Sequence, residues 1–208
     1  MAQVMVKSTF AKYSRIPCSR PITGKDAARL LMRANHITDV ATEPAAGSLT
    51  DHYDPRAKVL RLSQPVFNRN SIAAVGVAAH ETGHAIQHAQ RYGPLVLRSA
   101  LVPAANIGSS VGPWLAIAGI FFSLPILISL GIILFGGAVL FYLITLPVEF
   151  DASARAIAIL RDSHTLTPGE LQGVKKVLTA AAMTYVASAL TALMSFLRLI
   201  LLARNRRR

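Results

Sequence analysis

The chain has 208 residues, of which 52% are apolar and only 15% are charged, and its formal net charge is +12. Soluble domains are usually about a quarter charged, so this composition argues against an ordinary soluble protein. The basic residues form no long run with interleaved aromatic residues, which argues against nucleic-acid binding. Because Cys18 is the single cysteine, neither an internal disulfide nor a cysteine metal cluster can form.

Residues 1–20 form a basic lead-in that we expect to be extended or partly helical. The segment TGKDAARLLMRANH (23–36) then predicts a helix, because small and apolar residues recur on one face. Thr23 and Asp26 stand in the positions of a capping box at the start of this helix.

The next part of the chain predicts a β-hairpin followed by a helix. In GSLTDHYDPRAKVLRLS (47–63) the turn signal is Asp54-Pro55-Arg56, and apolar residues supply the returning strand. An edge strand of this hairpin could bind a peptide as an added strand, although a purely structural hairpin is an equal alternative. SIAAVGVAAHETGHAIQHAQRY (71–92) predicts a helix with Ser71 as its N-cap. Its many small residues indicate a helix buried at the centre of the fold.

The middle of the chain predicts two membrane-spanning helices. The stretch Ser99–Val148 contains no Asp, Glu, Lys or Arg. A spanning helix needs about 20 apolar residues, so the stretch can hold two. Its most apolar parts are 112–123 and 126–146, with a proline between them. We therefore expect a transmembrane hairpin whose first arm starts between Val102 and Val111, and the alternative is a pair of buried core helices.

The C-terminal part predicts two further helices. One, over 147–163, begins at Pro147, and a turn at Thr167-Pro168-Gly169 leads into another that begins near Glu170. The latter contains the uncharged run Val177–Leu197, which is long enough for a third span, with a buried core helix again as the alternative. Basic residues near the end of the chain suggest attachment to a membrane surface: Arg198, Arg204, Arg206, Arg207 and Arg208.

The segment HETGH (80–84) fits the His-Glu-x-x-His pattern of zinc enzymes. On a helix, His80 and His84 lie on one face, one turn apart, where two imidazoles can bind one ion. Glu81 would then stand beside the ion, where it can hold a water molecule and take its proton. The alternative, two histidines on a solvated helix face, is disfavoured by the apolar residues around the motif.

The third metal ligand is not evident from this motif. On a straight helix, His88 lies about 12 Å along the axis from His80 and is rotated by about 80°, so the two cannot easily share one tetrahedral ion. The metzincin pattern, with a histidine ten positions after the first, fails because that position is Gln90. We therefore expect His88 to be a supporting or surface residue, and the third ligand to come from elsewhere in the chain.

Glu149 is the best candidate for the third ligand. It is the first charged residue after the uncharged stretch, and a hairpin that leaves the membrane where it entered would return it to the side of His80 and His84. Two histidines and one glutamate leave a fourth position open, as catalysis requires. The alternative is a glutamate that merely ends the span. Weaker ligand candidates are Asp151, which would face elsewhere on the helix, and Asp51, His52 and Asp54.

Together these segments resemble the bacterial membrane-bound neutral zinc metallopeptidases of the YugP type. The resemblance covers nearly the whole chain and rests on VKSTFAKYS, LTDHYDP, SIAAVGVAAHETGHAIQHAQ, LPVEFDASARA and an alanine-rich final helix. It implies a zinc-dependent endopeptidase in which one Zn²⁺ is held by His80, His84 and Glu149, with Glu81 as the general base. Members of this family usually carry a further apolar segment ahead of VKSTF.

EFDASARA also resembles the glutamate segment of the HtpX-like membrane proteases, which implies a gluzincin-type arrangement. In many gluzincins, an aspartate four positions after the glutamate ligand supports a zinc-bound histidine. That position is Ser153 here, so we expect a different support, and Asp151 is a candidate for it. Arg155, His164 and the tyrosines are candidates for stabilising the oxyanion that forms during hydrolysis.

The expected fold is a mainly α integral membrane protein with a small zincin-like α+β portion, in which a β-hairpin lies beside the His-Glu-x-x-His helix. The expected parts are a zincin-like portion (1–98), a transmembrane hairpin (99–148), a third-ligand helix and turn (149–176), and a C-terminal transmembrane helix with a basic tail (177–208).

The expected function is hydrolysis of peptide bonds in membrane or membrane-proximal proteins. The expected partners are therefore a protein or peptide substrate and the lipid bilayer. Three alternatives stay open: a zinc hydrolase of another substrate class, a non-catalytic membrane scaffold with a structural zinc site, and a metal-handling protein.

The expected location is the bacterial inner membrane, which the chain would cross several times. An arginine-rich C-terminus on the cytoplasmic side would, with three spans, put the site outside. The basic excess of residues 1–98 and the resemblance to HtpX-like proteases favour the opposite orientation. We therefore expect a site on the cytoplasmic side.

Overall fold

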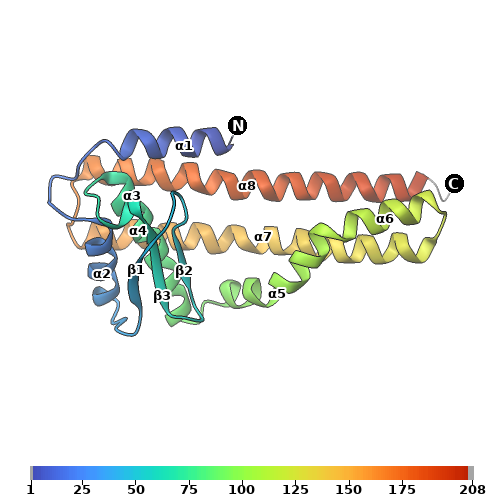
Figure 1. The fold of residues 1–208 in the computed structure, drawn as a ribbon, viewed down its shortest axis with the longest axis horizontal. Helices are drawn as coiled ribbons and strands as arrows, with labels where there is room; N and C mark the ends of the chain where they lie inside the picture. Colours follow the sequence, from blue (N-terminus) through green and yellow to red (C-terminus); the bar gives the residue numbers. More distant parts are fainter. Residues whose placement is uncertain (1, 206–208) are drawn as a thin grey trace. The chain divides into compact units, whose positions relative to one another are not determined.

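The computed structural model describes residues 2–205, so Arg206, Arg207 and Arg208 of the expected basic tail lie outside the described residues. The chain divides into two compact units. The first runs to Tyr92 and is completed by Glu149–Thr184, and the second consists of Gly93–Val148 and the chain from Tyr185 onward. The long helices α7 (Pro125–Asp162) and α8 (Pro168–Asn205), which Figure 1 labels, each contribute residues to both units.

Four helices form within residues 2–92, and two of them begin where their capping residues predict. These helices are α1 (Ala2–Tyr13), α2 (Gly24–Ala34), the short α3 (Gln64–Phe67) and α4 (Ile72–Ala89). Thr23 and Asp26 form the predicted capping box of α2, and the Ser71 side chain accepts a hydrogen bond from the backbone N–H of Ala74 at the start of α4. Both caps therefore confirm the predicted helix starts.

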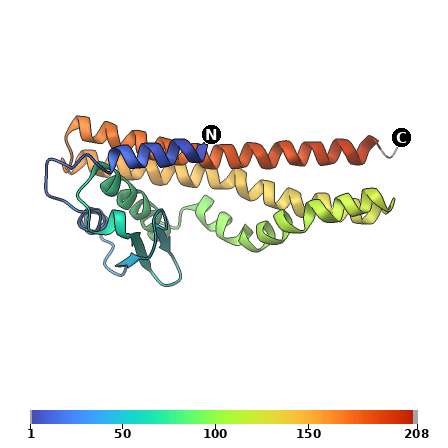
Figure 2. The same ribbon diagram turned by 45° about the horizontal axis from the view of Figure 1, so that its top comes forward.

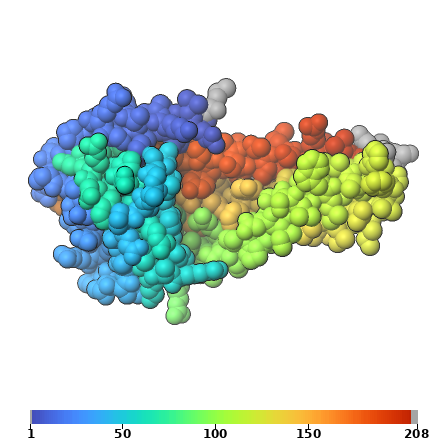
Figure 3. All heavy atoms as spheres, viewed as in Figure 1, coloured from blue at the N-terminus to red at the C-terminus, as the bar shows by residue number. Residues whose placement is uncertain are grey.

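A small sheet of strands β1 (Ala41–Ala45), β2 (His52–Asp54) and β3 (Val59–Ser63) belongs to the same unit. The strand order is β1-β3-β2, with β2 antiparallel to β3 as the predicted hairpin requires. Strand β1, which the sequence did not predict, pairs with β3 in parallel. In Figure 3, atoms of this region lie at the outer surface of the unit. Because β3 lies between β1 and β2 in the strand order, β2 is an edge strand, and β3 is the central strand with mostly buried residues.

Helix α4 occupies the centre of the first unit, as its small residues predict. Ala73 and Val75 belong to one hydrophobic cluster, together with Leu160 of α7 and Val174 of α8. A second cluster joins another side of α4 to β3 and α2, with members that include Leu60, Leu62, Ala74, Ala78 and Ala28. Because α4 is packed on two sides, the residues it carries at 80–84 are held on a rigid element.

The second unit contains α5 (Gly93–Ser110) and α6 (Gly112–Phe121), together with parts of α7 and α8. The first arm of the hairpin is helical from Gly93, ahead of the interval in which we expected it to start, and it is interrupted at Val111, the N-cap of α6. A Cβ atom on Gly108 would lie 2.1 Å from the Leu134 carbonyl oxygen, so only glycine permits this close approach of α5 to α7.

Within residues 2–205, three helical stretches are long and apolar enough to cross a membrane: Gly93–Phe121, Pro125–Asp162 and Pro168–Arg204. Only 22–28% of the most apolar part of each stretch is buried inside the protein. Trp114, Phe121 and Ile133 are each at least 69% exposed. This exposure argues against buried core helices. The predicted fold class, a mainly α membrane protein with a small α+β portion, is confirmed.

The predicted helix start at Pro147 is wrong, because Pro147 lies inside the continuous helix α7. Proline removes one helical hydrogen bond, which often ends a helix. Packing on both sides of the proline opposes that effect here: Ala138 is buried in a cluster of the second unit, and Ala156 is buried in one of the first. Glu149 therefore lies in the middle of a long helix and not at the start of a new one.

Candidate metal centre

Helix α4 presents His80 and His84 on the same face. The two ring centroids are 4.8 Å apart, and the side chains are only 13% and 12% exposed. The four-residue spacing places them one turn apart on the helix. The two imidazoles are thus positioned side by side before any ion binds.

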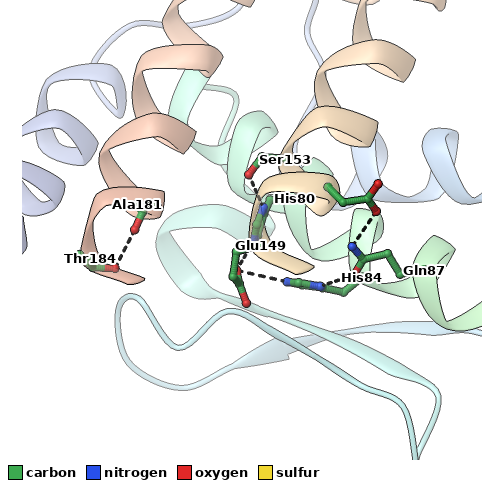
Figure 4. A network of polar contacts seen from close by, with 8 residues as sticks. His80, His84, Gln87, Glu149, Ser153, Ala181 and Thr184 are labelled. Carbon is green, nitrogen blue, oxygen red and sulfur yellow. Dashed lines mark hydrogen bonds and ion pairs between the residues drawn. The ribbon is translucent and has the colours of Figure 1, made fainter. Parts of the chain in front are cut away.

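Glu149 of α7 reaches both imidazoles (Figure 4). Its Oε2 atom lies 3.2 Å from His80 Nε2 and 3.6 Å from His84 Nε2, and the residue is only 2% exposed. Gly83 permits this approach, because a Cβ atom there would lie 2.5 Å from the Ala152 carbonyl oxygen of α7. One ligand atom from each of the three residues lies within 4.8 Å of the others, so the structure brings together the three ligands that we predicted.

Gln87 fixes the proton on His84. The side-chain amide nitrogen of Gln87 donates to Asp151 Oδ2 at 2.8 Å, since a carboxylate can only accept. The amide oxygen of Gln87 must then face His84 Nδ1, at 3.0 Å, so Nδ1 carries the proton and donates it. The Nε2 atom of His84 is left with a lone pair that points toward Glu149, which is the arrangement a metal-binding histidine needs.

His80 has a different support. Its Nδ1 atom lies 3.0 Å from the Ser153 hydroxyl, and its Nε2 atom faces Glu149 (Figure 4). Ser153 stands where many gluzincins have an aspartate, and it contacts one histidine, while Asp151 reaches the other through Gln87. The expectation that Asp151 supports a histidine therefore agrees with the contacts, although the contact runs through an amide.

The donor set fits a divalent cation with a preference for nitrogen and oxygen ligands. His84 Nε2 and Glu149 Oε2 are both acceptors, and two acceptors at close range are stable only with a positive charge between them. Burial acts to lower the pKa of His84, but a proton on Nε2 would supply such a charge, and its hydrogen bond to Glu149 together with the charges of Glu81 and Glu149 raises that pKa overall. The same anionic surroundings favour a bound cation, and two histidines with one carboxylate are a usual Zn²⁺ set.

The Gln87 contact predicts a measurable loss of metal affinity. We expect Gln87→Ala to weaken Zn²⁺ binding by about 10- to 100-fold, because the ring of His84 would lose the partner that sets its orientation and tautomer. Competition with a chromophoric chelator measures this affinity. Gln90→Ala is the matched control. Gln90 is a glutamine at the C-terminal end of the same helix, but its side chain bonds Arg155 and not His84. Equal affinities in the two variants would contradict the role of Gln87.

Glu81 follows His80 on α4 and is partly buried. One residue along a helix corresponds to a rotation of about 100°, so Glu81 points to the side of the pair formed by His80 and His84. Its charge acts on His84, which places the carboxylate in the electrostatic neighbourhood of the centre. This position suits a group that handles protons beside an ion better than a group that binds the ion.

The other sequence candidates have different partners. Nδ1 of His88 shares a 2.8 Å hydrogen bond with the hydroxyl of Tyr53 on β2. Burial raises the pKa of Tyr53 to about 12. Asp51 accepts from the backbone and hydroxyl of Ser63, and burial raises its pKa. His52 bonds the Thr50 carbonyl, and Asp54 bonds Arg61. His88 belongs to α4 and contacts the sheet through Tyr53, and the other three residues lie in or next to β2. None of them belongs to the cluster of His80, His84 and Glu149.

The two named oxyanion candidates are also engaged or distant. Arg155 bonds Asp151 and Gln90, and its guanidinium lies 5.6 Å from the centre of the Tyr92 ring. His164 lies beyond the end of α7, about 20 Å from Glu149 if the helix rise is followed. Gln87 is the residue that we had missed, and its signal was an amide three positions after a histidine on an otherwise apolar helix face.

Comparison with known proteins adds an independent finding. The chain matches, over residues 1–204, the model of a family described as "Putative neutral zinc metallopeptidase". It is 50% identical over 206 residues to a Bacillus subtilis (strain 168) protein described as "Putative membrane protease YugP". The matched residues cover 99% of this chain and 92% of that protein. No solved structure matches the chain.

Proposed function

Since the chain belongs to the family of neutral zinc metallopeptidases, we propose that it is a membrane-embedded zinc-dependent endopeptidase. The observation that carries this proposal is the convergence of His80, His84 and Glu149, with one ligand atom of each within 4.8 Å of the others. The proton on His84 Nδ1 and the Ser153 contact of His80 support the same assignment, because both leave Nε2 facing the centre.

His80, His84 and Glu149 would hold the ion, each with one ligand atom. A Zn²⁺ ion in such a site lowers the pKa of a water molecule toward neutrality and polarises a carbonyl group. The protein's own contribution to that chemistry is rigidity: α4 is packed on two sides, and Glu149 is almost fully buried. The ligand geometry is thus fixed in advance of substrate binding.

Glu81 is proposed as the general base. Its carboxylate would orient the attacking water, accept a proton from it and then deliver that proton to the nitrogen of the leaving amine. The oxygen of the deprotonated water forms the new bond to the carbonyl carbon, and the peptide C–N bond breaks as the amine nitrogen is protonated. Glu81 ends the cycle in the state in which it began.

The proposed substrates are membrane proteins or their membrane-proximal segments. Glu149 lies on α7, one of the helices that are long and apolar enough to span a bilayer, so a substrate must reach a site close to the membrane. The edge strand β2 offers unpaired backbone groups beside α4, and an extended peptide could add there as another strand.

We propose a bacterial inner membrane location with the centre on the cytoplasmic side.

Metal removal tests this function against the alternative of a scaffold with a structural zinc site. The detergent-purified protein is stripped with a chelator and then reloaded with Zn²⁺, and cleavage of an unstructured fluorogenic peptide is followed throughout. We expect activity to disappear on chelation and to return with about one equivalent of Zn²⁺ per chain. A protein that refolds and binds Zn²⁺ but never cleaves any member of a diverse peptide library would favour the scaffold.

A further inference from the structure

A pocket of about 410 Å³ lies between α1 and the first part of α8, and no residue of the metal centre lines it. Its polar lining comes from Thr9 and Lys12 of α1 and from Lys175, Lys176 and Thr179 of α8. Figures 1 and 2 both show α1 running alongside this part of α8. The three lysines are exposed, so their ammonium groups are accessible to a ligand.

The charge of this pocket is not balanced by the residues around it. No acidic residue lines the pocket, and in the described part of the chain none of its lysines forms an ion pair. Glu170, the acidic residue of α8 that precedes them, already accepts from Ser19 and Thr167. Lys12 also lies over the ring of Tyr13, with its ammonium 5.7 Å from the ring centre, but this contact leaves its charge unbalanced. Three ammonium groups without an acidic partner around one pocket favour an anion.

The pocket also lies at a defined level of α8. Lys175 and Lys176 directly precede Val177–Leu197, the uncharged run of a helix that is apolar enough to span a membrane. Basic residues at this position of a spanning helix lie at the height of the lipid headgroups. The lysines are therefore presented where the phosphates of the bilayer are most concentrated.

The opposite end of the pocket is apolar. Met5 and Ala180 line it, and Val4 beside them is 71% exposed. Because α1 and α8 run in opposite directions (Figure 1), the N-terminal half of α1 lies toward the apolar run of α8. The pocket thus has a cationic end at headgroup height and an apolar end at the height of the acyl chains.

We propose that this pocket binds an anionic phospholipid. The lysines would donate charge-assisted hydrogen bonds to the phosphate oxygens, and the hydroxyls of Thr9 and Thr179 would donate to the phosphate or the glycerol. The acyl chains would lie against Met5 and Ala180. Such a lipid would hold α1 on α8 and fix the depth of the first unit at the membrane surface. This inference rests on the membrane insertion of α8 and is independent of peptidase activity.

Native mass spectrometry of the full chain tests the proposal. The protein is released from micelles that contain equal amounts of phosphatidylglycerol and phosphatidylcholine, and the retained lipid is counted. We expect wild type to retain phosphatidylglycerol with an apparent affinity about a hundredfold above that of a Lys12→Gln, Lys175→Gln, Lys176→Gln variant. The reason is that each of the three lysines contributes a similar share of the electrostatic binding to the anionic lipid. The same triple change to arginine should keep the lipid.

A matched control removes the same charge elsewhere. The variant Arg29→Gln, Arg33→Gln, Arg56→Gln changes three exposed residues that do not line the pocket and should bind phosphatidylglycerol like wild type. Equal lipid loss in this control, undiminished retention in the lysine-to-glutamine variant, or displacement of the lipid by millimolar glycerol 3-phosphate would each overturn the proposal. Zinc content and peptide cleavage in the same samples report separately on the metal centre.

Discussion

Glu81→Gln is expected to abolish peptide cleavage while Zn²⁺ stays bound. A general base typically contributes a factor of 10² to 10⁴ to the rate, so we expect kcat to fall by roughly a thousandfold. Glutamine has the same shape as glutamate but cannot accept the proton of the attacking water. The proposed ligand atoms of His80, His84 and Glu149 are unaffected by the change, so the zinc content should remain at the wild-type level.

The measurement pairs turnover of a fluorogenic peptide with zinc content by elemental analysis. Glu43→Gln is a suitable control, because Glu43 undergoes the same change of side chain on strand β1, where it lies 3.6 Å from Arg61 and far in sequence from the centre. Normal turnover in Glu81→Gln would exclude Glu81 as the base. Loss of zinc from that variant would instead show that Glu81 helps to hold the ion.

Local signals in the sequence predict much of the first unit. The capping box of Thr23 and Asp26, the N-cap Ser71 and the turn at Asp54-Pro55-Arg56 all depend on neighbouring residues, and each occurs where it was expected. The three apolar helices are predicted as directly, because the length and the hydrophobicity of an uninterrupted run of residues can both be read from the sequence. The family resemblance, which rests on such segments, is confirmed by the family match.

The features that the sequence does not predict depend on contacts between distant segments. Strand β1 contains Glu43 and Pro44 and has no apolar alternation, and it is a strand because its backbone pairs with the buried strand β3. A proline is compatible with such an edge position. Pro147 is the converse case, in which a local signal for a helix start is overridden by packing along α7. Gln87 also depends on a distant contact, because the sequence shows an amide three positions after a histidine but not that Asp151 of α7 accepts a hydrogen bond from that amide.

The centre itself combines both kinds of information. His80 and His84 are placed by the helix period, which is local, but Glu149 is 69 residues away from His80 in sequence. What brings it in is the close contact of α4 and α7 at Gly83, where a methyl group would collide with the Ala152 carbonyl. The glycine inside HETGH therefore has a structural reason: without it, the two histidines and the glutamate would be held further apart.

Glu149→Ala is expected to remove most of the bound zinc. Zinc sites with a full set of ligands bind with about 10–16 kcal/mol, so the loss of one of three protein ligands should weaken binding by about 10²- to 10³-fold. Elemental analysis of wild type and variant, purified side by side, gives zinc per chain, and chelator competition gives the affinity. We expect about one zinc per chain in wild type and far less in the variant.

Two further variants separate loss of a ligand from loss of the fold. Glu149→Gln keeps the size of the side chain but replaces the anionic carboxylate oxygen by a neutral amide oxygen, which is a weak metal ligand. This variant should therefore also lose zinc while its circular dichroism spectrum matches that of wild type. Glu170→Gln changes a glutamate on α8 that bonds Ser19 and Thr167 and no histidine, so it should keep zinc. Wild-type zinc in Glu149→Ala would remove Glu149 from the coordination shell. The remaining ligand would then have to come from Asp151 or from the sheet residues Asp51, His52 and Asp54, all of which have other partners in the structure.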